Sequence, residues 1–282
     1  MITQIYEHPF LVICFLVFCL YILLKLRRSL LGEKDKGGIQ IGSSQILGSR
    51  DEQEDSYATV VNSNGVLAVL ADGMGGYSSG KQASGLVVQT FVDEFETKEI
   101  DSIENFFHNT SLLCNKKILS VTKEEKIGST LAAVRVDKGY LNWISIGDSA
   151  IILFREGELS NLNKKHIFQS MLEEQYQSGK ISKREVLNNP KKKRLTSYIG
   201  YEGLREIEVN KRAFKLLPGD RVILCSDGVY NSMTEVEIEE ILAMNLKPEK
   251  AAEKITRDIA AKNHHHQDNA TIIILDYKSR ML

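Results

Sequence analysis

Two aspartates in the first third of the sequence are spaced to form a pair of carboxylates. Asp55 and Asp72 bracket two apolar runs, and a turn containing Asn64-Gly65 joins these runs. Asn-Gly is a strong signal for a β-hairpin, so both carboxylates should arrive at the same end of the hairpin, within a residue or two of each other. Two anions held that close repel each other unless a cation lies between them.

Further candidate oxygen ligands follow or precede expected strands in the same way. Gly73 opens a glycine-rich segment whose backbone can approach an ion closely enough to offer a carbonyl oxygen. Asp227 comes directly after one strand-like run, and Asp268 precedes the last one. A single Asp-Gly pair is more often an ordinary turn, but several acids at strand ends favour a metal site. Ligation by oxygen alone favours magnesium or manganese over zinc.

The elements that must position these residues alternate between strands and helices. Apolar runs with strand character are expected at 39–47, 57–61, 66–71, 130–136, 140–146, 151–154, 221–225 and 271–275. Helices are expected from Ser79, where capping-box chemistry precedes apolar residues at helical spacing, and at 102–122, 166–178, 234–244 and 248–262. Short turns between strands indicate antiparallel pairing, so the pattern predicts a layered α+β sandwich over residues 39–282.

These residues belong to motifs that resemble, in order, those of the protein phosphatase 2C family. The matching segments cover nearly the whole chain after residue 38. They are Arg50 to Asp55, Ala71 to Gly76 with Gly80 and Ala83-Ser84, Gly128 to Leu131, Ile146 to Ser149, Lys165-His166 through Gly179 to Ser182 and on to Leu195-Thr196 and Ile199-Gly200, Pro218 to Asp220, Cys225 to Gly228, and Gln267 to Asn269 with Thr271.

The resemblance implies a four-layer fold, in which helices flank two antiparallel sheets, with a metal centre of two Mn²⁺ or Mg²⁺ ions at one edge. The metal ligands would be Asp55, Asp72, the carbonyl of Gly73, Asp227 and Asp268. Asp148 would help bind a third, weaker ion, as in bacterial relatives. Arg50 would hold the substrate phosphate, because its fork of donors suits phosphate oxygens. Glu54 would contact the metal ligands without binding a metal ion itself.

The activity implied is that of a metal-dependent protein serine/threonine phosphatase, with phosphorylated proteins as partners. Hydrolysis would use a water molecule that the two ions activate, without a phosphoenzyme. The alternative is a membrane-anchored pseudophosphatase that serves as a binding module. Departures from the family pattern lie outside the ligand set: Met74 replaces the histidine of eukaryotic relatives, and Ala150, Asn231 and Asn189 replace other frequent residues.

The N-terminus is predicted to anchor the chain in the cell membrane. Residues 9–24 carry no charge, and Lys25, Arg27 and Arg28 follow them. The stretch is short for a bilayer that needs about 20 apolar residues, so these cations would reach back to the interface. Their position predicts a single span over residues 1–28, a linker over 29–38 and a cytoplasmic catalytic domain. The alternative, a cleaved signal peptide, is disfavoured because the basic residues come after the apolar run.

Composition adds few constraints, and the remaining motifs have ordinary explanations. Lysine plus arginine (36) nearly equals aspartate plus glutamate (37), so no global charge indicates a nucleic-acid partner. Four cysteines without paired spacing suit a reducing compartment. We interpret Cys225 as a core residue, Asp220 as part of a turn and His264-His265-His266 as a solvated loop. The basic run 191–194 is interpreted as a solvated segment, or else as a site that attracts acidic phosphoproteins.

Overall fold

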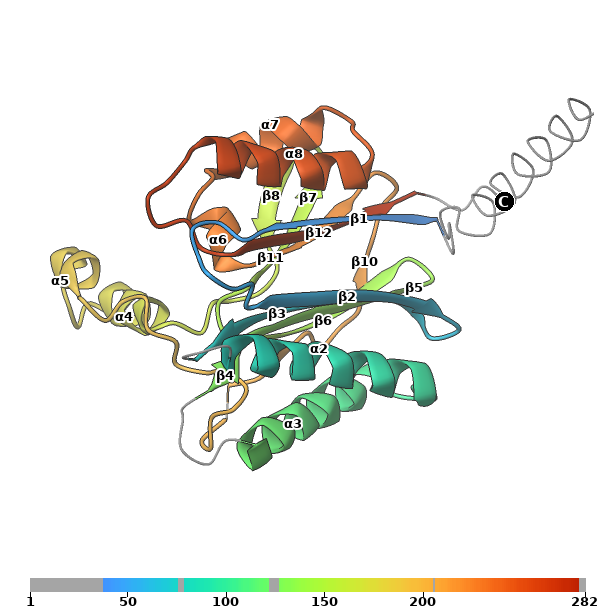
Figure 1. Ribbon diagram of the computed structural model, residues 1–282, viewed down its shortest axis with the longest axis horizontal. Helices are drawn as coiled ribbons and strands as arrows, with labels where there is room; N and C mark the ends of the chain where they lie inside the picture. Colours follow the sequence, from blue (N-terminus) through green and yellow to red (C-terminus); the bar gives the residue numbers. More distant parts are fainter. Residues whose placement is uncertain (1–37, 76–78, 122–126, 205, 279–282) are drawn as a thin grey trace, which may run out of the picture. The chain divides into compact units, whose positions relative to one another are not determined.

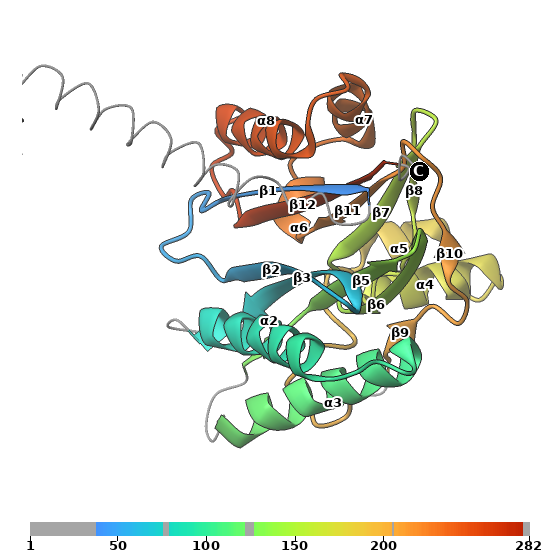
Figure 2. The same ribbon diagram turned by 90° about the vertical axis from the view of Figure 1, so that its right-hand side faces the viewer.

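Two antiparallel sheets form the centre of the fold, with helices on their outer faces (Figures 1 and 2). The computed structural model describes residues 38–75, 79–121, 127–204 and 206–278. The five-stranded sheet has the order β1 (Ile39–Ile46), β12 (Ala270–Tyr277), β11 (Arg221–Cys225), β7 (Ala150–Arg155) and β8 (Glu158–Asn161). The seven-stranded sheet has the order β10 (Phe214–Lys215), β6 (Tyr140–Ile146), β5 (Leu131–Asp137), β3 (Gly65–Met74) and β2 (Asp55–Asn62), with β4 (Gly128–Ser129) on β3 and β9 (Glu208–Val209) on β6.

Three buried apolar clusters account for the layering. The central cluster joins the inner faces of the sheets, with Leu70 and Val134 from one and Val222 and Ile273 from the other. Because successive strand residues point to opposite faces, the alternate residues of the same strands pack outward against helices. α2 (Ser79–Thr97) and α3 (Ile103–Val121) cover the seven-stranded sheet, and α7 (Glu235–Ala243) and α8 (Pro248–Ala261) cover the other. The predicted α+β sandwich of two antiparallel sheets flanked by helices is confirmed.

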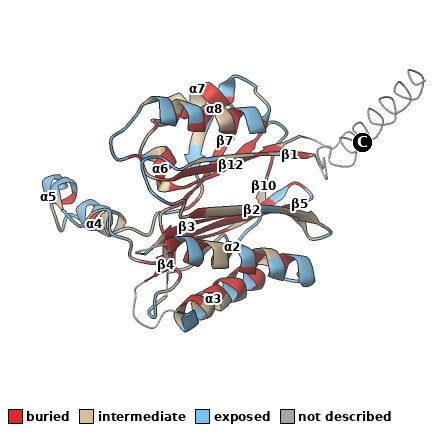
Figure 3. Ribbon diagram, in the orientation of Figure 1, coloured by how far each residue is buried: buried red, intermediate tan, exposed pale blue. Residues whose placement is uncertain are grey.

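The helix expected at 166–178 is α4 (Phe168–Gln177), and a second short helix follows it, α5 (Lys183–Asn188). These two helices project from the body of the domain in Figure 1 and are largely exposed in Figure 3. Only Leu172 of α4 and Val186 of α5 are buried. α5 was not predicted, although Ser182 and Glu185 form a capping box at its start.

The described part of the chain contains no helix with the length and hydropathy needed to cross a bilayer. The anchor predicted for residues 1–28 lies outside the described residues, as does all of the linker predicted for 29–38 except Gly38. Both therefore stay predictions. The first described strand begins at Ile39, the residue at which the catalytic domain was expected to start.

Candidate metal centre

Asp55 and Asp72 lie directly opposite each other on β2 and β3. The hairpin runs in register from Asn62 and Gly65 at the turn to this pair of acids at its far end. The sequence predicted that the two acids lie within a residue or two of each other at one end of the hairpin. The register of the strands confirms this prediction. Because directly opposed residues on one sheet face are near neighbours, the hairpin itself brings two carboxylates together.

Asp55 is buried, with 4% of its surface exposed, and its two oxygens have different surroundings. Oδ2 accepts hydrogen bonds from Ser226 Oγ at 2.8 Å and from Thr271 Oγ1 at 2.7 Å. Oδ1 is buried without a hydrogen-bond partner among the described residues. Burial raises the pKa of Asp55 to about 6, although the two hydrogen bonds act to lower it. A buried carboxylate oxygen that accepts nothing is costly, and a cation is one group that satisfies it.

Asp72 is held through its backbone, which leaves its carboxylate for other contacts. Its N–H donates to Thr130 Oγ1 at 2.9 Å, and its carbonyl accepts from Thr130 N–H at 2.8 Å. Burial first, and then the charges of Asp55 and Asp227, raise the pKa of Asp72 well above its ordinary value. This carboxyl group is thus surrounded by other acids.

Gly73 needs to be glycine because other backbone lies against it. A Cβ at Gly73 would lie 2.0 Å from the carbonyl oxygen of Gly80 and 2.9 Å from that of Glu54. The Gly73 N–H also donates to Glu54 O at 3.1 Å. The close approach at Gly73 is to the backbone of Gly80 and Glu54, and the role of its carbonyl as a metal ligand stays a prediction.

Asp227 begins the short helix α6 (Asp227–Tyr230) immediately after β11. Burial and the charges of Asp148 and Asp268 raise its pKa to about 7. Oδ2 of Asp227 accepts from Asn231 Nδ2 at 3.0 Å. The following Gly228 lets this turn pack on the loop before β12, because a Cβ there would lie 1.9 Å from the carbonyl oxygen of Asn269.

Asp268 pairs with Arg50: Nη2 of Arg50 lies 2.7 Å from Oδ2 of Asp268. Both side chains are partly exposed, at 53% and 37%. Neighbouring Asn269 fixes the loop that carries Arg50, because its Nδ2 donates to the carbonyls of Leu47 and Glu52 at 2.8 and 3.0 Å. Sequence reasoning placed Asn269 in a motif but gave it no role.

Glu54 directly precedes Asp55 in the sequence, as expected for a residue that supports the metal ligands without binding an ion itself. Its N–H donates to Asn269 Oδ1 at 2.8 Å, and its carbonyl accepts from Ser84 Oγ at 2.5 Å. Burial raises the pKa of its carboxyl group, and Arg50 opposes that shift. Glu54 therefore connects the loop of Arg50 with α2.

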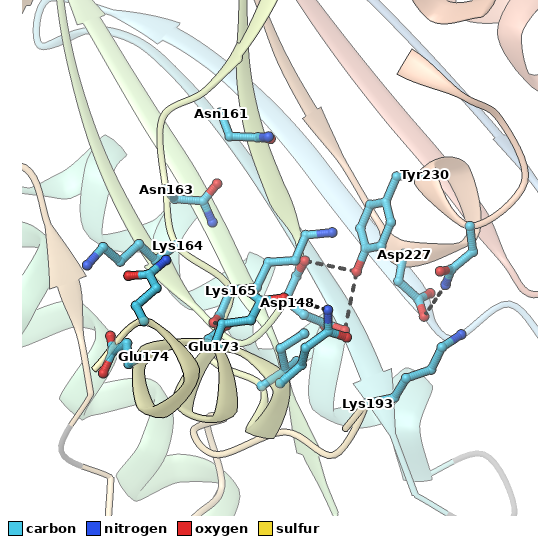
Figure 4. A pocket seen from close by; sticks show the side chains of 15 residues that line it. Asp148, Asn161, Asn163, Lys164, Lys165, Glu173, Glu174, Lys193, Asp227 and Tyr230 are labelled. Atoms are coloured by element: carbon cyan, nitrogen blue, oxygen red, sulfur yellow. Dashed lines mark hydrogen bonds between the residues drawn. The ribbon is translucent and has the colours of Figure 1, made fainter. Parts of the chain in front are cut away.

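Asp148 lies in a pocket of about 630 Å³ that Asp227 also lines (Figure 4). Tyr230 Oη donates to the carbonyl oxygen of Asp148 at 3.1 Å and to its Oδ2 at 3.3 Å. Burial raises the pKa of Asp148, and the charge of Lys165 and the Tyr230 hydrogen bond oppose the shift. Lys193, from the basic run 191–194, lines the same pocket.

The acids gather at one edge, but their oxygens do not yet converge on one point. Asp55, Asp227, Asp148 and Asp268 all raise the pKa of Asp72, so the five carboxylates lie within electrostatic reach. Among the described residues, however, no three His, Cys, Asp or Glu side chains take up the arrangement of a metal site. Asp268 turns to Arg50 and Asp227 to Asn231, so both would rotate to share an ion.

The residues present nevertheless suit a hard divalent cation. The donors are carboxylate and carbonyl oxygens, which magnesium and manganese prefer. The buried Oδ1 of Asp55 lacks a partner within the described chain, and burial alone makes a cluster of anions costly. A cation at this edge would relieve both costs.

The alternative explanations given to other motifs are also resolved. Cys225 is 1% exposed, and burial raises its pKa to about 12, so it is a core residue. His264, His265 and His266 are all exposed. Asp220 is more than a turn residue: it is 2% exposed and accepts from Arg155 Nε at 2.8 Å and Nη2 at 2.6 Å.

Comparison with known proteins gives a consistent result. A family model described as protein phosphatase 2C matches residues 42–262. The serine/threonine phosphatase stp of Listeria monocytogenes is 31% identical over 237 residues, which cover 80% of this chain and 91% of that protein. The structure of the Streptococcus agalactiae serine/threonine phosphatase superposes with a TM-score of 0.76 at 23% identity, over 85% of this chain and 100% of that one. The catalytic domain of the serine/threonine phosphatase PstP, solved with two manganese ions, has a TM-score of 0.68 at 24% identity, over 86% of this chain and 99% of that one.

Proposed function

The chain belongs to the protein phosphatase 2C family, and we propose that the acidic edge around Asp55 and Asp72 is its catalytic centre. The chain is a metal-dependent protein serine/threonine phosphatase, which hydrolyses phosphoserine and phosphothreonine in phosphorylated proteins. The observation that carries the site assignment is the register of the hairpin. It opposes Asp55 and Asp72, and Asp55 is buried with one carboxylate oxygen that has no partner in the described residues.

Two divalent ions, manganese or magnesium, are the cofactors. Asp55, Asp72, the carbonyl of Gly73, Asp227 and Asp268 would hold them. The ions would supply a water molecule of lowered pKa and neutralise negative charge on the phosphate. The shift of these carboxyl pKa values toward neutrality fits such a role, because metal binding and proton binding compete for the same oxygens.

The protein's own groups position the substrate and the ligands. Arg50 is exposed beside Asp268, so donors of its guanidinium can reach a phosphate from solvent while one donor stays on Asp268. Ser226 and Thr271 fix the carboxylate of Asp55 through Oδ2, which leaves Oδ1 to face the site. The hydrogen bonds of Asn269 hold the loop of Arg50 against the strand end that carries Asp268.

The test is a manganese-dependent assay on the full-length protein in mild detergent, with p-nitrophenyl phosphate and a phosphothreonine peptide. Asp227→Asn should reduce turnover by at least about a thousandfold, which is the scale expected when metal-dependent activation of water is lost. Asp258→Asn is the matched control, because Asp258 lies on α8 and pairs with Lys254 at 2.8 Å. Undiminished turnover in Asp227→Asn would refute the site. A wild type that binds phosphopeptide without turnover would instead be a pseudophosphatase.

We also propose that residues 1–28 anchor the enzyme in the cell membrane with its catalytic domain in the cytoplasm. The support is the uncharged run 9–24 and the three cations that follow it. The substrates would then be targets of a serine/threonine kinase that meet the enzyme at the membrane. In bacterial cells the chain should stay in the membrane pellet after alkaline carbonate washing, and a C-terminal green fluorescent protein should fluoresce. Release by carbonate, or a dark fusion, would argue against the anchor.

A further inference from the structure

Asp148 differs from the other acids of the site because it lies beside a tyrosine whose ring carries a lysine ammonium. Its carboxylate already accepts a hydrogen bond from Tyr230 Oη, and the same hydroxyl holds its carbonyl oxygen. Tyr230 belongs to α6, the helix that Asp227 begins. The phenol of Tyr230 therefore links Asp148 to α6, the helix that carries the expected metal ligand Asp227.

A lysine occupies the other side of that phenol. Nζ of Lys165 lies 3.1 Å from the centroid of the Tyr230 ring, which is close contact for a cation over an aromatic face. Lys165, Tyr230, Asp148 and Asp227 line one pocket (Figure 4). An ammonium on the ring and a carboxylate on the hydroxyl place opposite charges on two parts of one side chain, and each strengthens the interaction of the other with Tyr230.

We propose that the ammonium of Lys165 serves as a built-in counter-ion for Asp148, so that this enzyme binds two divalent ions and resists a third. This inference rests on the proposed function, and it replaces the expectation that Asp148 ligates a third ion. A divalent cation at Asp148 would enter a pocket that already holds a positive charge, and it would bind a carboxylate whose Oδ2 already accepts a hydrogen bond from Tyr230. The charge of Lys165 does reach Asp148, since it opposes the rise in the pKa of that carboxyl.

The other charges of the pocket do not change this conclusion. Lys193 also lines it and adds positive charge facing Asp148 and Asp227. Lys164 lines it from an exposed position, and Glu173 and Glu174 line it from α4. Of the three lysines that line this pocket, Lys165 is the one whose ammonium lies over the Tyr230 ring.

The experiment counts bound Mn²⁺ by electron paramagnetic resonance and titration calorimetry on the full-length protein in mild detergent. Wild type should bind two ions per chain up to millimolar Mn²⁺. Lys165→Met keeps an apolar side chain on the Tyr230 ring but removes the charge, so it should bind a third ion at least tenfold more tightly than wild type does. Adding Asp148→Asn to Lys165→Met should return the count to two.

Two controls separate charge from fold. Lys164→Met removes the neighbouring lysine of the same pocket and should leave the count at two, and Lys165→Arg keeps the charge and should do the same. If Lys165→Met does not fold, three ions on Lys164→Met or on Lys165→Arg would still refute the proposal. So would a wild type whose third ion disappears in Asp148→Asn, or an unchanged count in folded Lys165→Met. A wild type that binds no Mn²⁺ would instead refute the proposed function.

Discussion

Nη2 of Arg50 donates to Oδ2 of Asp268 across 2.7 Å, at a point where both side chains reach solvent. One comes from the loop before β2 and the other from the loop before β12, so 218 residues of sequence separate them. The pair joins the residue expected to hold phosphate to a residue expected to hold metal. It also makes the charge of Arg50 available at the mouth of the site.

Arg50→Lys is expected to raise KM for a phosphothreonine peptide by roughly tenfold, with a smaller change in kcat. Lysine keeps the charge, but it lacks the planar fork that matches two phosphate oxygens. Steady-state kinetics with a peptide substrate measures the effect. Lys81→Arg at the exposed start of α2 is a control for charge-conserving change. An unchanged KM would contradict the role given to Arg50.

Gly228→Ala is expected to destabilise the protein by about 2–4 kcal/mol and to weaken Mn²⁺ binding. The new methyl group would lie 1.9 Å from the carbonyl oxygen of Asn269, so the loop before β12 or the start of α6 has to move. Urea unfolding and Mn²⁺ titration measure the two effects. The matched control is Gly85→Ala on α2, where the nearest atom is Ser56 Oγ at 4.0 Å. That change should be neutral or stabilise by up to about 1 kcal/mol, since alanine is the better helix former.

Asp220→Asn is expected to lower stability by roughly 3 kcal/mol while folded enzyme keeps its kcat. Asp220 accepts two hydrogen bonds from Arg155 and one from Leu217 N–H, and it lies away from the acids of the site. Asp220 is the buried member of this pair, and neutralising it leaves the 29% exposed Arg155 and the Leu217 N–H with a weaker acceptor. Urea unfolding and turnover, measured on the same sample, test the two halves of this prediction. A loss of kcat without a loss of stability would mean that Asp220 has a catalytic role.

In the presence of a chelator, the protein is expected to lose stability as pH rises from 5 to 8. Burial raises the pKa of Asp55 to about 6 and of Asp227 to about 7, above the 3.8 of an exposed aspartate. Between these values the folded state binds more protons than the unfolded state, so its advantage falls as pH increases. The loss should be on the order of a few kcal/mol, since one pKa unit corresponds to about 1.4 kcal/mol.

Saturating Mn²⁺ should reverse this trend, because the metal binds deprotonated carboxylates. Urea midpoints at pH 5 and pH 8, with chelator or with Mn²⁺, provide the measurement. Asp227→Asn should show a shallower loss in chelator, as it lacks one of the titrating groups. A chelated wild type that gains stability over this range would show that these acids are ionised without cost.

Local sequence patterns were sufficient to predict the features that depend on residues close together in the chain. The Asn64-Gly65 turn sets the register of one hairpin, and that register alone places Asp55 opposite Asp72. Apolar runs located the long strands, because most of these strands bury several apolar residues in succession, as β3, β5, β7, β11 and β12 do. They missed β4, β9 and β10, which have two residues each and exist through pairing with β3 or β6, and they missed the four-residue β8. A strand that short has no periodicity of its own.

Contacts between distant segments could not be predicted in the same way. Nothing near Lys165 indicates that its ammonium lies on Tyr230, which is 65 residues later and belongs to a helix of four residues. The ion pair between Arg155 and Asp220 was likewise hidden behind an ordinary turn motif. The resemblance supplied the list of metal ligands. The structure adds that Ser226 and Thr271 hold Asp55 and that Asn269 holds the loop of Arg50.

The first described strand, β1, pairs along its whole length with the last, β12, and β12 lies inside its sheet with β11 on the other side. The ribosome makes β12 after every other described strand, so β1 stays without its partner until the last of these strands has been synthesised. The same final segment delivers Thr271 to Asp55 and Asp268 to Arg50. A product that terminates before Asp268 would therefore lack both the strand that pairs with β1 and the acid that pairs with Arg50.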